Sequence, residues 1–168
     1  MLLTALLLAL AAPTDQAALA VVEKIAGQVG FYTADGQRLA GVPVSVHPHE
    51  IVLSRDQRQL YVSDNGVLWM TDPGEGGNTV TILDVAKRAK VGEISLGRSR
   101  RPHGMDVDAK TGRLVVTVEN PPGLLLVDPA GRKVLKSYDT QGTMPHMVLL
   151  TPGAEWAYVS NSGTHTIA

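Results

Sequence analysis

The feature that most constrains this chain is an internal repeat marked by a Pro-His pair. The pair occurs three times, at intervals of 54 and then 43 residues, as Pro48-His49, Pro102-His103 and Pro145-His146. Counted from each histidine, positions two, four, twelve and thirteen are apolar, and position fourteen is a hydroxyl residue: Ser63, Thr117 or Ser160. A self-similar period of this length is typical of propellers and other repeat folds.

Apolar and polar residues alternate with a period of two within each copy, and turn residues separate the alternating stretches. This pattern predicts short strands, one opening at each Pro-His pair and a second carrying the hydroxyl residue. Two further strands are expected in the complete copies, over residues 79–84 and 91–96, and over residues 124–128 and 133–138. Four antiparallel strands per copy favour the blades of a β-propeller over a sandwich.

The second strand of each copy carries a motif that resembles the YVTN-repeat β-propellers. It reads Tyr61-Val62-Ser63-Asp64-Asn65, then Val115-Val116-Thr117-Val118-Glu119-Asn120, then Tyr158-Val159-Ser160-Asn161. The resemblance covers about residues 23–168 and implies a seven-bladed, usually exported propeller, of a family related to the haem-binding propeller of cytochrome nitrite reductase. We therefore expect an all-β fold that is an incomplete propeller, about three blades of the seven.

The two ends of the repeat region are expected to be partial blades. Residues 23–46 resemble only the third and fourth strands of a blade, and the sequence ends where a third strand would start. We expect the chain to be the N-terminal part of a longer protein. A head-to-tail oligomer that completes a ring is the less favoured interpretation.

The N-terminus is typical of an export signal. Residues 1–12, MLLTALLLALAA, are almost entirely apolar, too short for a membrane-spanning helix of about 20 residues but suited to a secretory signal. Ala18-Leu19-Ala20 fits the Ala-x-Ala cleavage rule. We expect a signal peptide over residues 1–20 and a propeller domain over 21–168. The mature protein is expected in the periplasm or outside the cell, without a membrane attachment.

Composition and motifs exclude several function classes. A net charge of −1, with 18% charged residues, argues against a nucleic-acid binder. The chain has no cysteine, which excludes disulfides, thiolate metal sites and covalent c-type haem attachment. No Walker loop, His-Glu-x-x-His sequence or Ser-His-Asp order is present. We expect a binding scaffold rather than an enzyme, with no cofactor, whose partner is a small ligand or a protein.

The main candidate site consists of His49, His103 and His146. Because the Pro-His strands are expected to lie nearest the propeller axis, their imidazoles should form an arc around the mouth of the channel. They could bind a ligand there, or bond to the neighbouring blade as a repeated packing device. A shared metal site is the least favoured interpretation, because we expect adjacent blades to separate the rings beyond the ligand distances of one ion, about 2.0–2.1 Å.

Arg98, Arg101 and Trp69 extend this candidate ligand site. Arg98, Arg100 and Arg101 precede Pro102-His103 and could form a positive rim that attracts anions, or a solvated turn. Trp69 lies in a glycine-rich insertion, residues 65–78, that accounts for the longer repeat interval. An insertion on a rigid scaffold often carries binding function, although a buried Trp69 would only cap the blade.

Two alternative functions follow from the same residues. Lactonase propellers also open blades with Pro-His, so a lactonase-like hydrolase acting on an anionic sugar lactone would use His103 and Arg101 as acid/base and anion anchor. In a haem-associated electron-transfer propeller, a channel histidine would ligate the iron.

Overall fold

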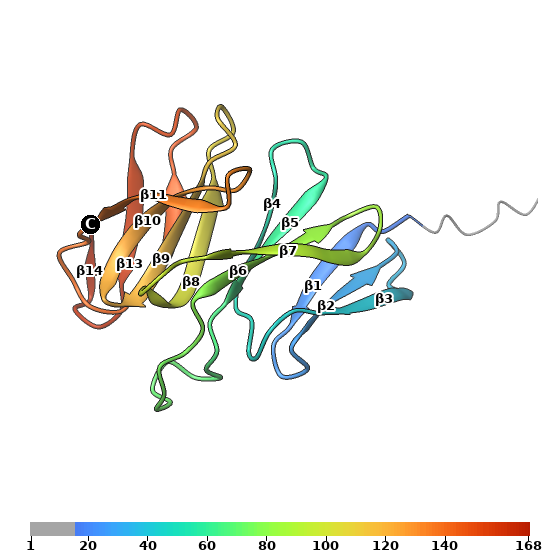
Figure 1. Ribbon diagram of the computed structural model, residues 1–168, viewed down its shortest axis with the longest axis horizontal. Helices are drawn as coiled ribbons and strands as arrows, with labels where there is room; N and C mark the ends of the chain where they lie inside the picture. The colour runs from blue at the N-terminus through green and yellow to red at the C-terminus, as the bar shows by residue number, and fades with distance from the viewer. Residues whose placement is uncertain (1–15) are drawn as a thin grey trace, which may run out of the picture.

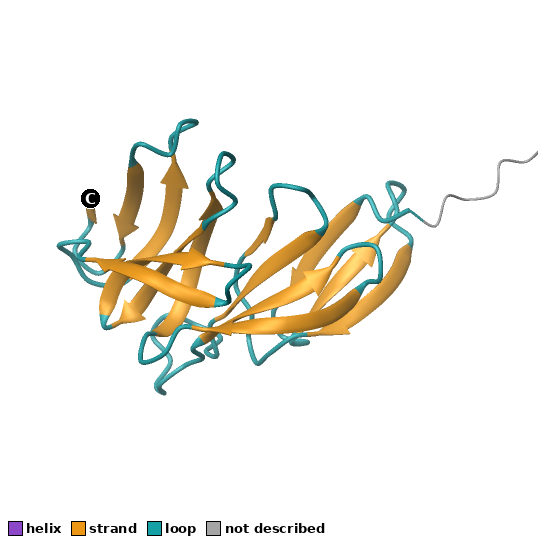
Figure 2. Cartoon of the chain, turned by 45° about the horizontal axis from the view of Figure 1, so that its top comes forward, coloured by secondary structure: helices purple, strands orange, loops and turns teal. Residues whose placement is uncertain are grey.

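The computed structural model describes residues 16–168, and within them all regular secondary structure is β-strand. No helix in that part of the chain could cross a membrane. The strands form four antiparallel sheets, here called blades 1 to 4, which follow one another in chain order from right to left in Figure 1 and are fanned against each other in Figure 2. The predicted all-β partial propeller is confirmed.

Each blade is a simple meander of neighbouring strands. Blade 1 contains β1 (Leu19–Glu23), β2 (Gln28–Tyr32) and β3 (Arg38–Pro43). Blade 2 contains β4 (Ile51–Leu53), β5 (Gln59–Asp64), β6 (Thr79–Asp84) and β7 (Ala89–Ser95). Blade 3 contains β8 (Arg100–Val107), β9 (Leu114–Asn120), β10 (Pro122–Asp128) and β11 (Lys133–Tyr138). Blade 4 contains β12 (Pro145–Leu150), β13 (Ala157–Asn161) and β14 (Thr166–Ile167).

The sequence prediction missed β1. It assigned two strands to residues 23–46, whereas blade 1 has three, because Leu19–Glu23 pairs with β2 throughout its length. Leu19 and Ala20 were interpreted as the end of the signal peptide, so β1 lies across the predicted boundary after Ala20. Most of the predicted signal peptide, residues 1–15, lies outside the described residues.

The register of the second and third strands is the same in all four blades. The pairs Val22–Val29, Ser63–Val80, Thr117–Leu124 and Ser160–Ile167 are equivalent. β1 and β2 are therefore the second and third strands of blade 1, and blade 4 contains the first three. The 65–78 insertion connects β5 to β6, as predicted, and is the long green loop below β6 in Figure 1.

The apolar core lies between blades rather than within them. Val29 and Phe31 of blade 1 pack with Leu60, Val62 and Leu83 of blade 2. Equivalent clusters join blade 2 to blade 3 and blade 3 to blade 4. Because each inner sheet is covered on both faces, its strands consist mainly of β-branched and aliphatic residues, and each such buried side chain contributes about 1.5–3 kcal/mol.

The repeated hydroxyl residue stabilises the strand that carries the histidine. Each hydroxyl oxygen accepts a hydrogen bond from the backbone N–H one residue after the histidine: 2.9 Å from Glu50 to Ser63, 2.8 Å from Gly104 to Thr117, and 3.1 Å from Met147 to Ser160. The strand register shifts at this point in blades 3 and 4, which takes these amides out of the ladder. The hydroxyl satisfies the displaced donor.

Candidate functional site

The three predicted histidines lie against one another in a series that we call the histidine row. His49 precedes β4, His103 is in β8 and His146 is in β12. The ring centroids of His49 and His103 are 4.5 Å apart, and those of His103 and His146 are 3.8 Å apart, with interplanar angles of 82° and 78°. The structure therefore brings the rings into edge-to-face contact, closer than the separation that we expected between blades.

The close contact depends on a glycine at the inner strand of blade 3. A Cβ atom on Gly104 would lie only 2.5 Å from the carbonyl oxygen of His146 and 2.7 Å from Cα of Met147. The absent side chain lets β12 approach β8 directly. The hydroxyl of Thr117 then donates a 2.7 Å hydrogen bond to the same carbonyl of His146. These contacts fix the spacing between blades 3 and 4 at the histidine row.

All three imidazoles are neutral at pH 7. Burial, reinforced by the neighbouring histidines and Lys24, lowers the pKa of His103 to about 3. Burial also lowers the pKa of His49 and of His146 below the ordinary histidine value. A neutral imidazole offers a nitrogen lone pair and an N–H donor instead of a positive charge. The row is therefore suited to hydrogen bonding or to metal coordination, and it does not provide imidazolium groups for an anion.

The ring nitrogens differ in whether the protein satisfies them. Nε2 of His49 is 2.9 Å from the carbonyl oxygen of Val67. The Nδ1 atoms of His103 and His146 are buried and, within residues 16–168, have no hydrogen-bond partner. Buried polar atoms in folded proteins are nearly always paired. Within the same residues, no group of three or more histidine, aspartate or glutamate side chains is arranged to hold a metal ion.

Lys24 is the cation beside the row, and the sequence interpretation missed it. It lies in the turn between β1 and β2, with its ammonium 5.7 Å from the ring centroid of Trp69. Burial lowers the pKa of Lys24, while Glu50 and Asp72 oppose that shift. Trp69 itself is 65% exposed, so it is not a buried cap. No repeat pattern marked Lys24, because the turn that carries it is specific to blade 1.

The predicted arginines occupy different environments. Arg98 is exposed in the turn before β8, and Arg100 is 3.6 Å from the carboxylate of Glu75. The guanidinium of Arg101 donates hydrogen bonds to backbone carbonyls of the insertion and lies 3.5 Å from Glu119. Arg101 therefore already has partners within the protein, and its predicted role as an anion anchor stays a prediction.

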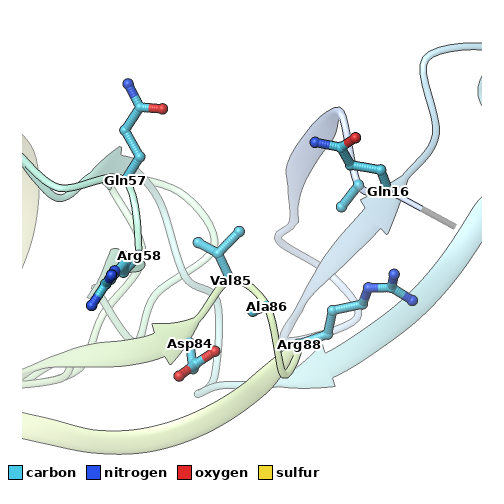
Figure 3. Close-up of a pocket in the computed structure, with 8 residues that line it drawn as sticks. Gln16, Gln57, Arg58, Asp84, Val85, Ala86 and Arg88 are labelled. Carbon is cyan, nitrogen blue, oxygen red and sulfur yellow. The ribbon is translucent and has the colours of Figure 1, made fainter. Parts of the chain in front are cut away.

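Grooves between the blades open at the ends of the strands that lie opposite the histidine row. The groove between blades 1 and 2, about 400 Å³, is lined by Gln16, by the β4–β5 turn and by the β6–β7 turn. Figure 3 shows Val85 at its centre, with Gln57 and Arg58 on one side and Gln16 on the other. Similar grooves of about 440 and 570 Å³ follow at the next two junctions. None of the predicted site residues lines these three grooves.

Comparison with known proteins identifies the fold only. No family model and no curated protein sequence matches this chain. Many solved structures resemble it. Among them are hydrazine synthase of Kuenenia stuttgartiensis (18% identity, TM-score 0.73) and a functionally unknown protein of Desulfotomaculum acetoxidans DSM 771 (12%, 0.66). A third is the dihydro-heme d1 dehydrogenase NirN in complex with DHE (19%, 0.65).

These similarities cover 86%, 88% and 88% of this chain. They cover only 39%, 46% and 31% of the three solved chains, so the present chain spans less than half the length of each. At these identities the similarity carries the architecture and no residue role. The chain thus shares the propeller architecture of hydrazine synthase and NirN.

Proposed function

We propose that this protein is an exported binding scaffold whose histidine row binds a ligand at the inner strands. The observation that carries the proposal is the pair of buried Nδ1 atoms, on His103 and His146, that have no partner within residues 16–168. If the row were only a packing device, each unpaired atom would cost about 1–3 kcal/mol with no return. A ligand that takes up imidazole nitrogens removes that cost.

The neutral state of the rings indicates the chemical class of the ligand. Neutral imidazoles bind transition-metal centres and hydrogen-bond donors through their lone pairs. Trp69 is exposed beside Lys24 and offers an apolar surface in the same insertion that contacts His49 through Val67. Export rests on the apolar N-terminal sequence and on Ala18-Leu19-Ala20.

A second candidate is a specific form of the first, in which the ligand is a haem-type tetrapyrrole. It is favoured by the resemblance to NirN, which was solved in complex with DHE. The donor set fits this group, because an unpaired imidazole nitrogen is the type of axial ligand that haem iron accepts. Both unpaired Nδ1 atoms are buried, but the His146 residue as a whole is only half-buried, whereas His103 is 6% exposed, so of the two His146 would hold the iron. The bound group would supply redox chemistry.

The hydrolase alternative receives less support from the geometry. General acid–base catalysis is most efficient when the pKa of the group lies near the working pH. The pKa of His103 is lowered to about 3 by burial, which leaves its imidazole a weak base. The guanidinium of Arg101 already contacts three carbonyls and a carboxylate.

The proposal is tested by titrating the chain with hemin and, separately, with Cu²⁺. Hemin binding is followed by Soret absorption, and both probes by the ring resonances of the three histidines. We expect His146→Ala to abolish the hemin signal, and His165→Ala, in the exposed β13–β14 loop, to leave it unchanged. A shift with Cu²⁺ alone would contradict the haem form and support the wider proposal. If neither probe shifts the histidine resonances, the proposed function is wrong.

A further inference from the structure

The insertion over residues 65–78 is a closed loop with an ordered base. The N–H of Gly77 donates a 2.7 Å hydrogen bond to the carbonyl of Asn65, which brings the two ends of the loop together. Gly66 and Gly76 adopt positive φ angles of 85° and 75°, which glycine tolerates without strain. The side-chain amide of Asn65, itself fully buried, donates to the carbonyl of Pro102 at 3.1 Å. The loop is thereby attached to the inner strand of blade 3.

Arg101 provides the second attachment. Its backbone N–H donates to the carbonyl of Gly77 at 2.8 Å. Its guanidinium donates to the carbonyls of Met70, Asp72 and Gly74 at 3.2, 2.7 and 2.7 Å. A Cβ atom on Gly76 would lie 2.4 Å from Cγ of Arg101, so the loop is wrapped directly against this side chain.

The carboxylate of Glu119, in β9 of blade 3, balances the charge of Arg101. Nη1 lies 3.5 Å from the carboxylate of Glu119, and the two side chains are only 14% and 6% exposed. Burial raises the pKa of Glu119, and the guanidinium of Arg101 opposes that shift. Arg101 also has a φ of 53°, a left-handed conformation that is unfavourable for a residue with a side chain. The surrounding contacts therefore hold this residue in a strained position.

The same loop places a carbonyl on the first histidine of the row. The carbonyl oxygen of Val67 lies 2.9 Å from Nε2 of His49. Because a carbonyl can only accept, Nε2 of His49 must carry the proton. In the neutral ring, Nδ1 then holds the lone pair, and this is the nitrogen of His49 that remains able to bind a metal centre or accept a hydrogen bond.

We infer that Arg101 and Glu119 are positioning residues for the histidine row. They hold the insertion so that the carbonyl of Val67 fixes the Nε2–H tautomer of His49 and directs the Nδ1 lone pair to the ligand. The role of that lone pair rests on the proposed function, whereas the positioning itself does not. Arg101 thus acts on the row through the loop.

The experiment follows the Nε2–H resonance of His49 by NMR in the ¹⁵N-labelled chain at pH 7, without any ligand. In the wild type, the hydrogen bond to Val67 protects this proton from exchange with water. We expect Arg101→Met to accelerate the exchange at least tenfold. Arg101→Lys keeps a positive charge opposite Glu119 but cannot reach three carbonyls, so it should give the same direction of change. Arg100→Met is the matched control, because among the described residues the only ion pair of Arg100 is with the exposed Glu75, and it should change nothing.

The outcomes separate positioning from general stability. Unchanged amide and His103 ring resonances show that a variant is folded, and a faster His49 exchange in such a variant supports the inference. If Arg101→Met does not fold, the exchange rate of the His49 proton in Arg101→Lys tests the inference instead. Protection of the His49 proton that persists in the folded Arg101 variants overturns the inference. A failure of hemin and Cu²⁺ to bind would leave this result intact, because the measurement requires no ligand.

Discussion

Blades 2 and 4 carry the same residue pattern on the face that points toward the following blade, but only in blade 2 is that face covered. Tyr61 in β5 is 4% exposed, because the aliphatic side chains of β8 to β10 in blade 3 pack against it. Tyr158 occupies the equivalent position in β13 and is 53% exposed. On the same face of blade 4, Leu149 and Ile167 are 66% and 75% exposed. Burial in this fold is therefore produced by the blade junction and not by the blade itself.

The face of blade 1 that points away from blade 2 is partly polar. Glu23 accepts 2.5 Å hydrogen bonds from the hydroxyl of Tyr32 and the amide of Gln28, and lies 3.3 Å from the guanidinium of Arg38. These side chains lie over Gly30, where a Cβ atom would be only 2.2 Å from the carboxylate. Blade 1 thus has a polar surface over part of this face, whereas the face of blade 4 that carries Tyr158 is mainly apolar.

The largest expected effect comes from the two tyrosines themselves. Tyr61→Ala should lower the free energy of unfolding by about 3–5 kcal/mol, because it leaves a cavity between blades 2 and 3. Tyr158→Ala removes the same side chain from an uncovered face and should change stability by less than about 0.5 kcal/mol. Urea denaturation of both variants measures the difference. Equal losses would show that burial at the junction does not set the stability.

Two ion pairs extend the comparison to charged residues. Glu119→Ala should destabilise the chain by about 3 kcal/mol, because it leaves the mostly buried Arg101 without its counter-charge. Glu75→Ala removes the partner of Arg100 from the surface, where such pairs contribute little, and should have no measurable effect. Thermal unfolding of the two variants provides the check. A large loss for Glu75→Ala would contradict the assignment of the buried pair as the stabilising one.

The covered environment of His103 should make stability depend on pH. Burial lowers the pKa of His103 to about 3 in the folded state, against about 6.5 when unfolded. Between these values the unfolded chain binds the proton and the folded chain does not. Stability therefore falls as the pH decreases through this window, by up to about 1.4 kcal/mol per pH unit.

This dependence is measured by urea denaturation at several pH values between 4 and 7. His103→Gln should reduce the slope, whereas His165→Gln, in the exposed loop before β14, should leave it unchanged. A slope that is the same in all three proteins would show that His103 is not the group responsible.

The smallest expected difference concerns the repeated hydroxyl. Thr117 is fully buried and bonds both the amide of Gly104 and the carbonyl of His146, so Thr117→Val should cost about 2 kcal/mol by leaving those groups unpaired. Ser160→Ala, in the partly uncovered blade 4, should cost about 0.5 kcal/mol, because water can replace the bond to Met147. Chemical denaturation of the pair tests the order. A larger loss for Ser160→Ala would reverse the comparison.

The repeat in the sequence was sufficient to predict the strands other than β1, and the common location of the three histidines. The period-two alternation of apolar and polar residues indicated which side of each strand is buried. The spacing between His103 and Thr117 placed these two residues on adjacent strands of one blade. The bounds of the insertion could also be predicted, because it interrupts an otherwise regular interval.

Contacts between segments that share no periodicity could not be predicted in this way. Lys24 reaches the site from a turn of blade 1, and the partners of Arg101 depend on the path of a glycine-rich loop. The short distance between imidazoles depends on the absence of a side chain at Gly104. These features arise from packing between blades, which a one-dimensional pattern does not describe.

The hydroxyl–amide bond also determines where the chain tolerates changes in length. Each Ser or Thr is the fourteenth residue after its histidine, so a residue added within either of the two paired strands would shift the hydroxyl away from its amide. The connection between the second and third strands of a blade lies outside this spacing and varies in length. It spans residues 65–78 in blade 2 but only Pro121 in blade 3. A foreign peptide grafted at Pro121 would therefore be displayed at the imidazole end of the strands, while the inner strands keep their geometry.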